Sequence, residues 1–370
     1  MERWSEEKAW AWYNSHPWIR GCNYMSASCA NRIDQWQSLH FDEYLVETER
    51  ELEAMAKLGF NSVRLILEYV VWEKEHDVFL ENFERYVSLC HKYGISCMIV
   101  LANDCMPPKT ELWKMPDIGE QHYDVGYHGG RRHSQHGAHN GPAPHYYFDD
   151  PVSRESYYKM IEEMVTLYKD DPRILMWDLF NEPGNSRREG ISLPILKELF
   201  ALVRKINPSQ PLTVGAWWFD LEDFHTSAEN QFALENSDII TYHCYDRYEN
   251  HVRLIKYLKS YNRPLLNTEW LARITGNTVF DNFPLFYLEN IGCYNWGFVA
   301  GKYQTYEPYE AHWNWYKEDK DAPIDFTKWF HDLLRPSLRP YDPRETELIT
   351  RLCHLADKEF EAKKSTRKEK

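Results

Sequence analysis

Short apolar segments alternate along the chain with longer segments in which apolar residues recur every three or four positions. Continuous apolar runs predict strands of a parallel sheet, and the longer spacing predicts amphipathic helices that cover it. One such helix carries Leu45, Leu52 and Met55 on one face, and Gly59 predicts its end. The predicted strands are residues 18–27, 60–67, 95–103, 174–183, 211–218, 238–245, 264–273 and 292–301.

Eight strand–helix units favour an α/β fold of the closed (β/α)8 TIM barrel type. We expect one catalytic domain over residues 1–370, with the barrel core at 18–301, a long insertion after the third strand at 104–150 and a C-terminal helical extension at 302–370. Without the insertion the core has roughly 240 residues, near the size of a typical barrel. A doubly wound open sheet is the alternative, but no GxGxxG turn follows the first strand. Helical spacing in the extension predicts two helices, near 326–334 and 344–360.

Composition narrows the classes of function. The net charge of −14 argues against a nucleic-acid partner, and no apolar run is long enough to predict a membrane span. The N-terminal segment lacks the apolar run of a secretory signal, and the eight cysteines lack CxxC spacing. We therefore expect reduced thiols and a cytoplasmic location. Aromatic residues make up 15% of the chain, which predicts a bulky core or a cleft lined with stacking rings.

The candidate chemistry begins in the segment "ILMWDLFNEPGN" at 174–185. Asn181 and Glu182 come at the carboxyl end of the fourth predicted strand, the end where barrel enzymes place their reactive groups. A second carboxylate, Glu269 in "LLNTEWLAR", comes at the same end of the seventh strand. These strands lie nearly opposite each other in a barrel, so the two carboxylates face each other across its mouth. Two opposed carboxylates are the groups that hydrolyse glycosidic bonds.

This pair of motifs resembles the clan A retaining glycoside hydrolases, and most of all family 5 and its near relatives, over roughly residues 18–301. The clan carries an Asn-Glu acid/base pair after strand four and a Glu nucleophile at strand seven. The resemblance implies a retaining double displacement with Glu182 as acid/base and Glu269 as nucleophile. It also implies that Arg64 is the cation beside the nucleophile and that Asn181 contacts the sugar 2-hydroxyl. His243 and Tyr245 would orient the two carboxylates, and Trp296 would form an aromatic platform under the sugar.

Other candidate sugar contacts lie near strand ends. Asn103 ends the third predicted strand, where family 5 enzymes often carry a His instead. The remaining candidates can equally be packing residues, and they are Asn23, Trp217, Trp218 and Trp270. We expect the carboxyl groups of Glu182 and Glu269 to lie about 5 to 5.5 Å apart. We also expect burial and the neighbouring carboxylate to raise the pKa of Glu182, and Arg64 to keep Glu269 ionised.

A histidine-rich segment at 120–147 interrupts the barrel pattern. His133, His136 and His139 recur at every third position, but Gly and Pro surround them in place of the rigid frame that metal sites use. We therefore expect no metal and no cofactor. A long loop after a barrel strand more often forms a lid or a binding loop, and Arg131 and Arg132 could then contact substrate hydroxyls.

A walled cleft favours an exo-acting retaining β-glycosidase that hydrolyses oligosaccharides or glycosides. An endo-acting β-glycanase of the mannanase, glucanase or xylanase type is the alternative. A metal-dependent barrel hydrolase would carry HxH on the first strand, which "GCNYMSA" lacks, and a non-catalytic sugar-binding barrel would usually have lost one carboxylate. The sugar and the oligomeric state stay open.

Overall fold

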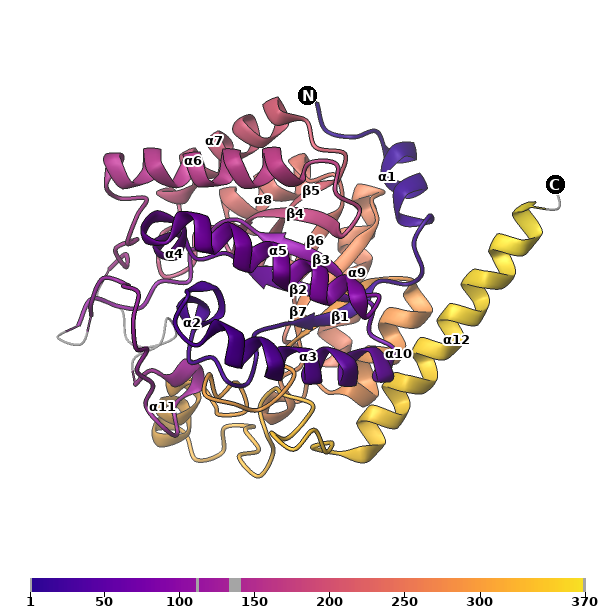
Figure 1. Cartoon of the computed structure of the whole chain (residues 1–370). Helices are drawn as coiled ribbons and strands as arrows, with labels where there is room; N and C mark the ends of the chain where they lie inside the picture. Colours follow the sequence, from indigo (N-terminus) through magenta and orange to yellow (C-terminus); the bar gives the residue numbers. More distant parts are fainter. Residues whose placement is uncertain (1, 111–112, 133–140, 369–370) are drawn as a thin grey trace.

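Eight parallel strands close into a barrel in chain order, and Figure 1 shows strands at the centre of the molecule with helices around them. The computed structural model describes residues 2–110, 113–132 and 141–368. Each strand pairs with its sequence neighbours, and the β1–β8 pair completes the ring. The strands are β1 (Arg20–Asn23), β2 (Ser62–Ile66), β3 (Ser96–Val100), β4 (Ile174–Asn181), β5 (Leu212–Ala216), β6 (Ile240–His243), β7 (Leu265–Trp270) and β8 (Gly292–Trp296). The (β/α)8 prediction is confirmed, and each observed strand is shorter than the range predicted for it.

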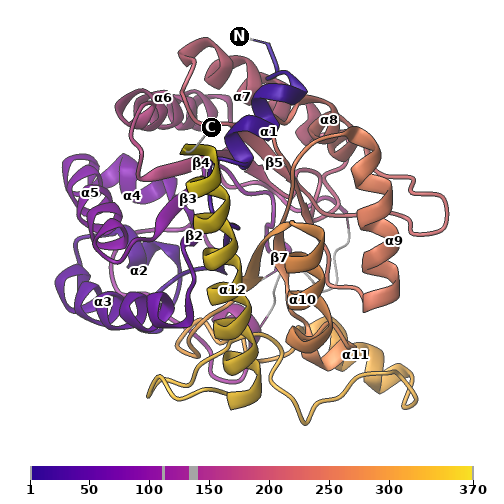
Figure 2. The same cartoon turned by 90° about the vertical axis from the view of Figure 1, so that its right-hand side faces the viewer.

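Helices surround the barrel on its outer side (Figures 1 and 2). In α3 the chain turns out of the helix at Gly59, whose φ of 90° suits glycine. The α-helices of the described residues are α1 (Glu6–Tyr13), α2 (Arg32–Trp36), α3 (Phe41–Leu58), α4 (Tyr69–Lys74), α5 (His76–Lys92), α6 (Pro151–Tyr168), α7 (Ser192–Ile206), α8 (Ala228–Asn236), α9 (Tyr248–Leu258), α10 (Val279–Glu289), α11 (Glu310–Glu318) and α12 (Pro343–Lys368). None of the described helices is both long and apolar enough to cross a membrane.

One predicted helix is wrong. Residues 326–334 form turns and a bridge, and the helix of this region is α11, which lies before the predicted range. Leu334 pairs with Val299 after β8 and with Pro340, and Phe330 accepts a hydrogen bond from the backbone of Arg273. These backbone contacts with the barrel outweigh the helical spacing of the apolar side chains.

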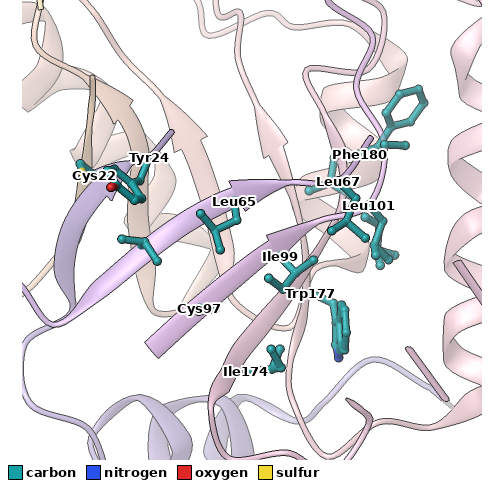
Figure 3. Close-up of a cluster of buried hydrophobic side chains, with 14 of the residues drawn as sticks. Cys22, Tyr24, Leu65, Leu67, Cys97, Ile99, Leu101, Ile174, Trp177 and Phe180 are labelled. Atoms are coloured by element: carbon teal, nitrogen blue, oxygen red, sulfur yellow. The ribbon is translucent and has the colours of Figure 1, made fainter. Parts of the chain in front are cut away.

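Side chains on the strands alternate between two apolar layers. Leu65 and Leu67, and Ile99 and Leu101, take alternate positions along their strands and share one cluster (Figure 3). The intervening positions supply a separate cluster with residues of α1, formed by Met98, Met176, Leu266, Tyr294, Ala9 and Tyr13. The outward-facing side chains therefore pack against the helices. The inward-facing positions near the carboxyl ends of the strands carry polar groups.

Two segments outside the regular units pack on the barrel. The insertion after β3 meets the loop after β8, because Gly126 N–H donates to Gln304 Oε1 and His128 Nδ1 lies 2.8 Å from the carbonyl oxygen of Glu307. Helix α12 packs against α10 and α3, and Figure 2 shows it running along that side of the molecule. Arg20 of β1 pairs with Asp357 of α12 at 2.7 Å. The insertion therefore adds to the rim of the barrel, and α12 supports its outer wall.

Candidate active site

Glu182 follows β4 at the point where the chain leaves the barrel. Its φ of 49° is a left-handed value that a side chain with a Cβ adopts only under constraint. The residue is 8% exposed, and His243 Nδ1 lies 2.6 Å from its Oε1. Cys105 donates its S–H to Oε2 at 3.0 Å, and Asn185 Nδ2 donates to the same oxygen. Contacts at both oxygens therefore fix the carboxyl group.

Glu269 lies on β7 and faces Glu182 across the mouth. Arg64 Nη1 donates to its Oε1 at 3.0 Å, and the Tyr245 hydroxyl donates to its Oε2 at 2.9 Å. One carboxylate oxygen of each glutamate and a ring nitrogen of His243 all lie within 4.8 Å of one another. Two carboxyl groups this close can act on opposite sides of one sugar C1–O bond.

Arg64 joins several strands from inside the barrel. It is fully buried, and its guanidinium donates to Asp178 Oδ2 at 2.7 Å, Asn181 Oδ1 at 2.6 Å and Asn23 Oδ1 at 2.7 Å, in addition to Glu269. The structure thus places Arg64 where a cation was expected, beside Glu269. Because one planar group makes all these bonds, it sets the spacing between β1, β4 and β7 at the site.

His243 ends β6 with its ring between the two carboxyl groups. Its Nδ1 lies 2.6 Å from Glu182 and 3.5 Å from Glu269. Gly215 on the neighbouring strand leaves room for this ring, since a Cβ at that position would lie 2.8 Å from His243 Nε2. The glycine of "LTVGA" therefore determines where the imidazole can sit.

The charges share a buried site. Burial raises the pKa of Glu269, and Glu182 adds to the rise, while His243, Arg64 and Tyr245 oppose it. Burial lowers the pKa of Arg64, but Asp178 and Glu269 reverse the shift, so the net pKa is raised. The expected contact between Arg64 and Glu269 is present, yet burial outweighs it in the pKa of the carboxyl group. One cation among three carboxyl groups favours retention of a proton on the carboxyl cluster.

A pocket of about 660 Å³ opens above the two glutamates. The loops after every strand except β7 contribute to its lining, and β7 contributes Glu269 itself. The residues expected at the site that line it are Asn103, Asn181, Glu182, Trp217, Trp218, His243, Tyr245, Glu269 and Trp296. Among them, Asn103 Oδ1 accepts from Asn181 Nδ2 at 2.8 Å, and Trp217 Nε1 donates to the carbonyl of Pro183 at 3.1 Å.

Two expected sugar contacts lie elsewhere. Trp270 is 1% exposed and packs its ring on Phe283 and Phe286 of α10, because it follows Glu269 directly and so takes the outer face of β7. The prediction of a sugar contact at Trp270 is therefore wrong. Asn23 lies below the pocket, where its Nδ2 donates to the carbonyl of Thr268 at 2.7 Å while its Oδ1 accepts from Arg64. Asn23 thus positions Arg64 and does not reach the pocket.

The insertion contributes to the pocket wall. His128, Arg131 and Tyr146 line it, whereas Arg132 pairs with Asp124 at 3.4 Å. The evenly spaced histidines considered as metal ligands, His133, His136 and His139, lie outside the described residues. In the described part of the chain, one group of three metal-ligating side chains comes together, and it consists of the two glutamates and His243. Of these contacts, the 2.6 Å distance between His243 and Glu182 suits proton transfer.

Sequence reasoning missed several contributors to the site. Asp178 is an inward-facing carboxylate on the strand "ILMWDLFN", a signal that its apolar neighbours make visible. Asn185 follows Glu182 by one turn, and Tyr309 comes from the loop after β8. Cys105 lies in the irregular segment after β3, where no periodic pattern assigns a direction to its side chain.

Comparison with known families agrees with this geometry. The family model described as cellulase (glycosyl hydrolase family 5) matches residues 24–329, which include β2 to β8 and both glutamates. The chain belongs to glycosyl hydrolase family 5. This family match agrees with the resemblance inferred from the sequence and covers both glutamates. Within family 5, the chain shares its fold with enzymes of differing action.

The exo-β-1,4-mannosidase Op5Man5 from Opitutaceae bacterium strain TAV5 superposes with a TM-score of 0.57 at 16% identity, over 92% of this chain and 60% of that one. A family 5 mannosidase from Rhizomucor miehei gives a TM-score of 0.55 at 15% identity, over 93% and 94% of the two chains. The probable mannan endo-1,4-β-mannosidase C of Aspergillus terreus is 23% identical over 189 residues, 45% of this chain and 41% of that protein. The matched regions span less than half of the first curated relatives.

Proposed function

We propose that this protein is an exo-acting β-glycosidase that removes terminal sugars from short β-linked oligosaccharides, with β-mannosides as its preferred substrates. In this proposal Glu182 is the acid/base and Glu269 is the nucleophile. The observation that carries it is the buried glutamate pair, whose nearest oxygens lie within 4.8 Å with His243 beside them. Retaining enzymes keep their carboxyl groups about 5 to 5.5 Å apart, and inverting enzymes about 6.5 to 9.5 Å apart.

The reaction proceeds in two displacements. In the first, Glu269 attacks the anomeric carbon, the bond from that carbon to the glycosidic oxygen breaks, and Glu182 gives its proton to the departing oxygen. In the second, water attacks the same carbon and gives a proton to Glu182, and the bond to Glu269 breaks. The sugar leaves with its original anomeric configuration, and both glutamates return to their starting protonation states.

Neighbouring side chains prepare each carboxyl group. Arg64 and Tyr245 direct their donors at Glu269 and hold it in one orientation. Asn181 is held by Arg64 at its oxygen and by Asn103 at its nitrogen, and we propose that it meets the sugar 2-hydroxyl. Trp296 lines the pocket at the end of β8, which suits a platform under the sugar ring.

The ends of the pocket differ, and this difference supports exo action. The leaving group must lie on the side of Glu182, and there Trp217 contacts Pro183 while Trp218 is 46% exposed. The pocket is also lined by side chains from the loops after β1, β2 and β3, namely Arg32, Glu68 and Tyr146, and we propose that they wall the end that receives the terminal sugar. A pocket walled at that end accepts a chain terminus more readily than the middle of a polymer.

The polar groups of the walled end suit sugar hydroxyls. The Tyr147 hydroxyl donates to Glu68 at 3.5 Å, and Arg32 lines the same wall. Burial raises the pKa of Glu68, while Arg32 and Arg131 oppose the rise. A carboxylate and guanidinium groups on one wall offer acceptors and donors to adjacent hydroxyls of a terminal sugar.

The preference for mannose rests on the similar proteins. Two solved structures with this fold are mannosidases, and one is described as exo-acting on β-1,4 bonds. One relative is described as a probable endo-acting mannan hydrolase, so endo action is our second candidate for this protein. The exposed Trp218 would suit that alternative, because it leaves the leaving-group side open to a longer chain.

The test uses purified protein with 4-nitrophenyl β-glycosides of mannose, glucose, galactose and xylose, followed by β-1,4-manno-oligosaccharides labelled at the reducing end. We expect the fastest turnover on the mannoside and stepwise release of unlabelled mannose. Glu269→Gln serves as the control for contaminating activity. Release of labelled short products from the first minutes, with a fall in mannan viscosity, would replace exo action by endo action. A different preferred glycoside would replace the sugar and leave the mechanism in place.

A further inference from the structure

Cys105 touches both members of the Asn181–Glu182 pair at the end of β4. Its Sγ lies 3.0 Å from Glu182 Oε2 and 3.4 Å from Asn181 Nδ2. The backbone N–H of Cys105 donates to Asn103 Oδ1 at 3.4 Å, the oxygen that also accepts from Asn181. Of the chain's eight cysteines, the other seven are buried, whereas Cys105 is partly exposed and lines the pocket. The thiol is therefore a part of the pocket wall that contacts the acid/base directly.

We propose that Cys105 is a positioning residue that tunes the proton affinity of Glu182. This inference rests on the proposed role of Glu182 as acid/base. The thiol donates its hydrogen to Oε2, and a donor to the ionised form of a carboxyl group lowers the pKa of that group. It also accepts from the amide of Asn181, so the same sulfur ties the orientation of Asn181 to that of Glu182.

A weak donor suits the double role of Glu182. The residue must hold a proton in the first displacement and lack one in the second, so neither state can be strongly favoured. An S–H group donates more weakly than O–H or N–H, and it therefore stabilises the carboxylate only slightly. Burial raises the pKa of Cys105, and the charge of Glu182 adds to the rise. The thiol consequently keeps its proton while Glu182 titrates, and the bond runs from sulfur to oxygen in each cycle.

The main experiment compares Cys105→Ser and Cys105→Ala by the pH dependence of kcat/KM on a glycoside whose leaving group needs protonation. Serine donates more strongly, so the alkaline limb should move to lower pH, and alanine removes the donor, so the limb should move to higher pH. Each shift should be about 0.4 to 1 pH unit, the equivalent of one net hydrogen bond. Cys353→Ser, in a buried position on α12, is the matched control and should leave the limb in place.

The opposite directions of the two shifts in the alkaline limb distinguish a hydrogen bond that sets the pKa of Glu182 from a loss of packing. A change that only disturbs packing would lower kcat in both variants and leave both limbs where they are, and that result would overturn the proposal. Two shifts in the same direction would also overturn it, because a hydrogen bond cannot be strengthened by both changes.

A second measurement reads the contact without catalysis. Methyl methanethiosulfonate reacts with a thiolate to form a mixed disulfide and release methanesulfinate, and mass spectrometry follows the labelling of Cys105. Glu182→Gln removes the neighbouring charge, so the pKa of the thiol should fall and labelling at fixed pH should become several-fold faster. An unchanged labelling rate would show that the Cys105 thiol does not contact the Glu182 carboxylate. If the rate rises but Glu182 proves not to be the acid/base, the proposed function fails while the contact stands.

Discussion

At the scale of single residues, one buried cation organises the reaction centre. Arg64 contacts Asp178, Asn181 and Glu269 at once, and it is 1% exposed. Lysine carries the same charge on a single nitrogen and cannot reproduce a planar fork. The geometry of the guanidinium, beyond its charge, therefore determines how Glu269 is presented.

We predict that Arg64→Lys lowers kcat/KM by about 100-fold, the usual effect of losing one preorganised donor. The acidic limb of the pH–rate profile should move to higher pH, because Arg64 opposes the rise in the pKa of Glu269 and the nucleophile must be ionised. Steady-state kinetics across pH would show both effects. Arg50→Lys, at an exposed ion pair with Glu47, is the control. An unmoved acidic limb would mean that Arg64 does not govern the ionisation of Glu269.

A second buried residue ties stability to pH away from the pocket. Burial raises the pKa of Glu51 to about 8, although the Tyr24 hydroxyl and the Ala27 N–H donate to it. The folded state therefore binds this proton more tightly than the unfolded state, so its contribution to stability is present at low pH and is lost as pH rises.

We predict that Glu51→Gln becomes more stable relative to the parent by a few kcal/mol as pH rises from about 5 to about 8, at ~1.4 kcal/mol per pKa unit. Urea unfolding at several pH values measures the difference in free energy. The amide oxygen can accept from Ala27, so the substitution keeps a hydrogen bond. The slope of the difference against pH is the diagnostic quantity, and a flat difference would contradict a raised pKa.

At the scale of elements, the loop after β4 is held in an unusual backbone conformation. Glu182, Ser186 and Arg187 all have positive φ. Asp104, after β3, accepts from Gly184 N–H at 2.8 Å, from Arg188 Nε at 2.8 Å and from the Ser192 hydroxyl. A single carboxylate thus clamps the segment that carries Glu182 to the start of α7.

We predict that Asp104→Ala lowers kcat by about 100-fold through misplacement of Glu182. The variant should also lose about 3 kcal/mol or more of stability, because Arg188 keeps only Asp149 as its charge partner. Ser192→Ala removes one bond of the same clamp and should have a much smaller effect. Kinetics and urea unfolding measured on the same samples separate the two consequences, and a folded Asp104→Ala protein with full kcat would refute the clamp.

The eight strands and most of the outer helices were predictable, because the strands lie within short apolar runs and each long helix has one apolar face. The opposition of Glu182 and Glu269 followed from that order. The local irregularities did not, since the β4–β5 register shifts between Asp178 and Asn181, and the β7–β8 register shifts between Asn267 and Trp270. These shifts decide which side chains face inward, and an apolar pattern does not record them. Trp270 is a different case, because strand alternation alone places it on the outer face, directly after the inward-facing Glu269.

At the scale of the whole molecule, the C-terminal helix supports the barrel from outside. The N-terminal part of α12, up to Ala356, buries Ile349, Cys353 and Ala356, and Glu345 forms a buried ion pair with Arg273 at 2.7 Å. The helix extends beyond the body of the barrel at its far end, as Figure 1 shows. Its two halves therefore differ in their contribution to stability.

We predict that a chain ending after Glu361 keeps its melting temperature, whereas one ending after Tyr341 is strongly destabilised. The shorter chain leaves Arg273 buried without Glu345, a loss of about 3 to 5 kcal/mol, and exposes the surface under Ile349. Calorimetry of both chains checks this. Equal melting temperatures would show that α12 does not support the barrel.

The most direct test of the account is the stereochemistry of azide rescue in Glu182→Ala and Glu269→Ala, with an activated aryl β-glycoside and proton NMR of the product. Without Glu182 the glycosyl-enzyme still forms, and azide, which needs no base, should attack it to give the β-glycosyl azide. Without Glu269 azide should attack the substrate directly and give the α-glycosyl azide. These products would place the acid/base on β4 and the nucleophile on β7. The opposite pair of anomers would contradict the assignment and exchange the two roles.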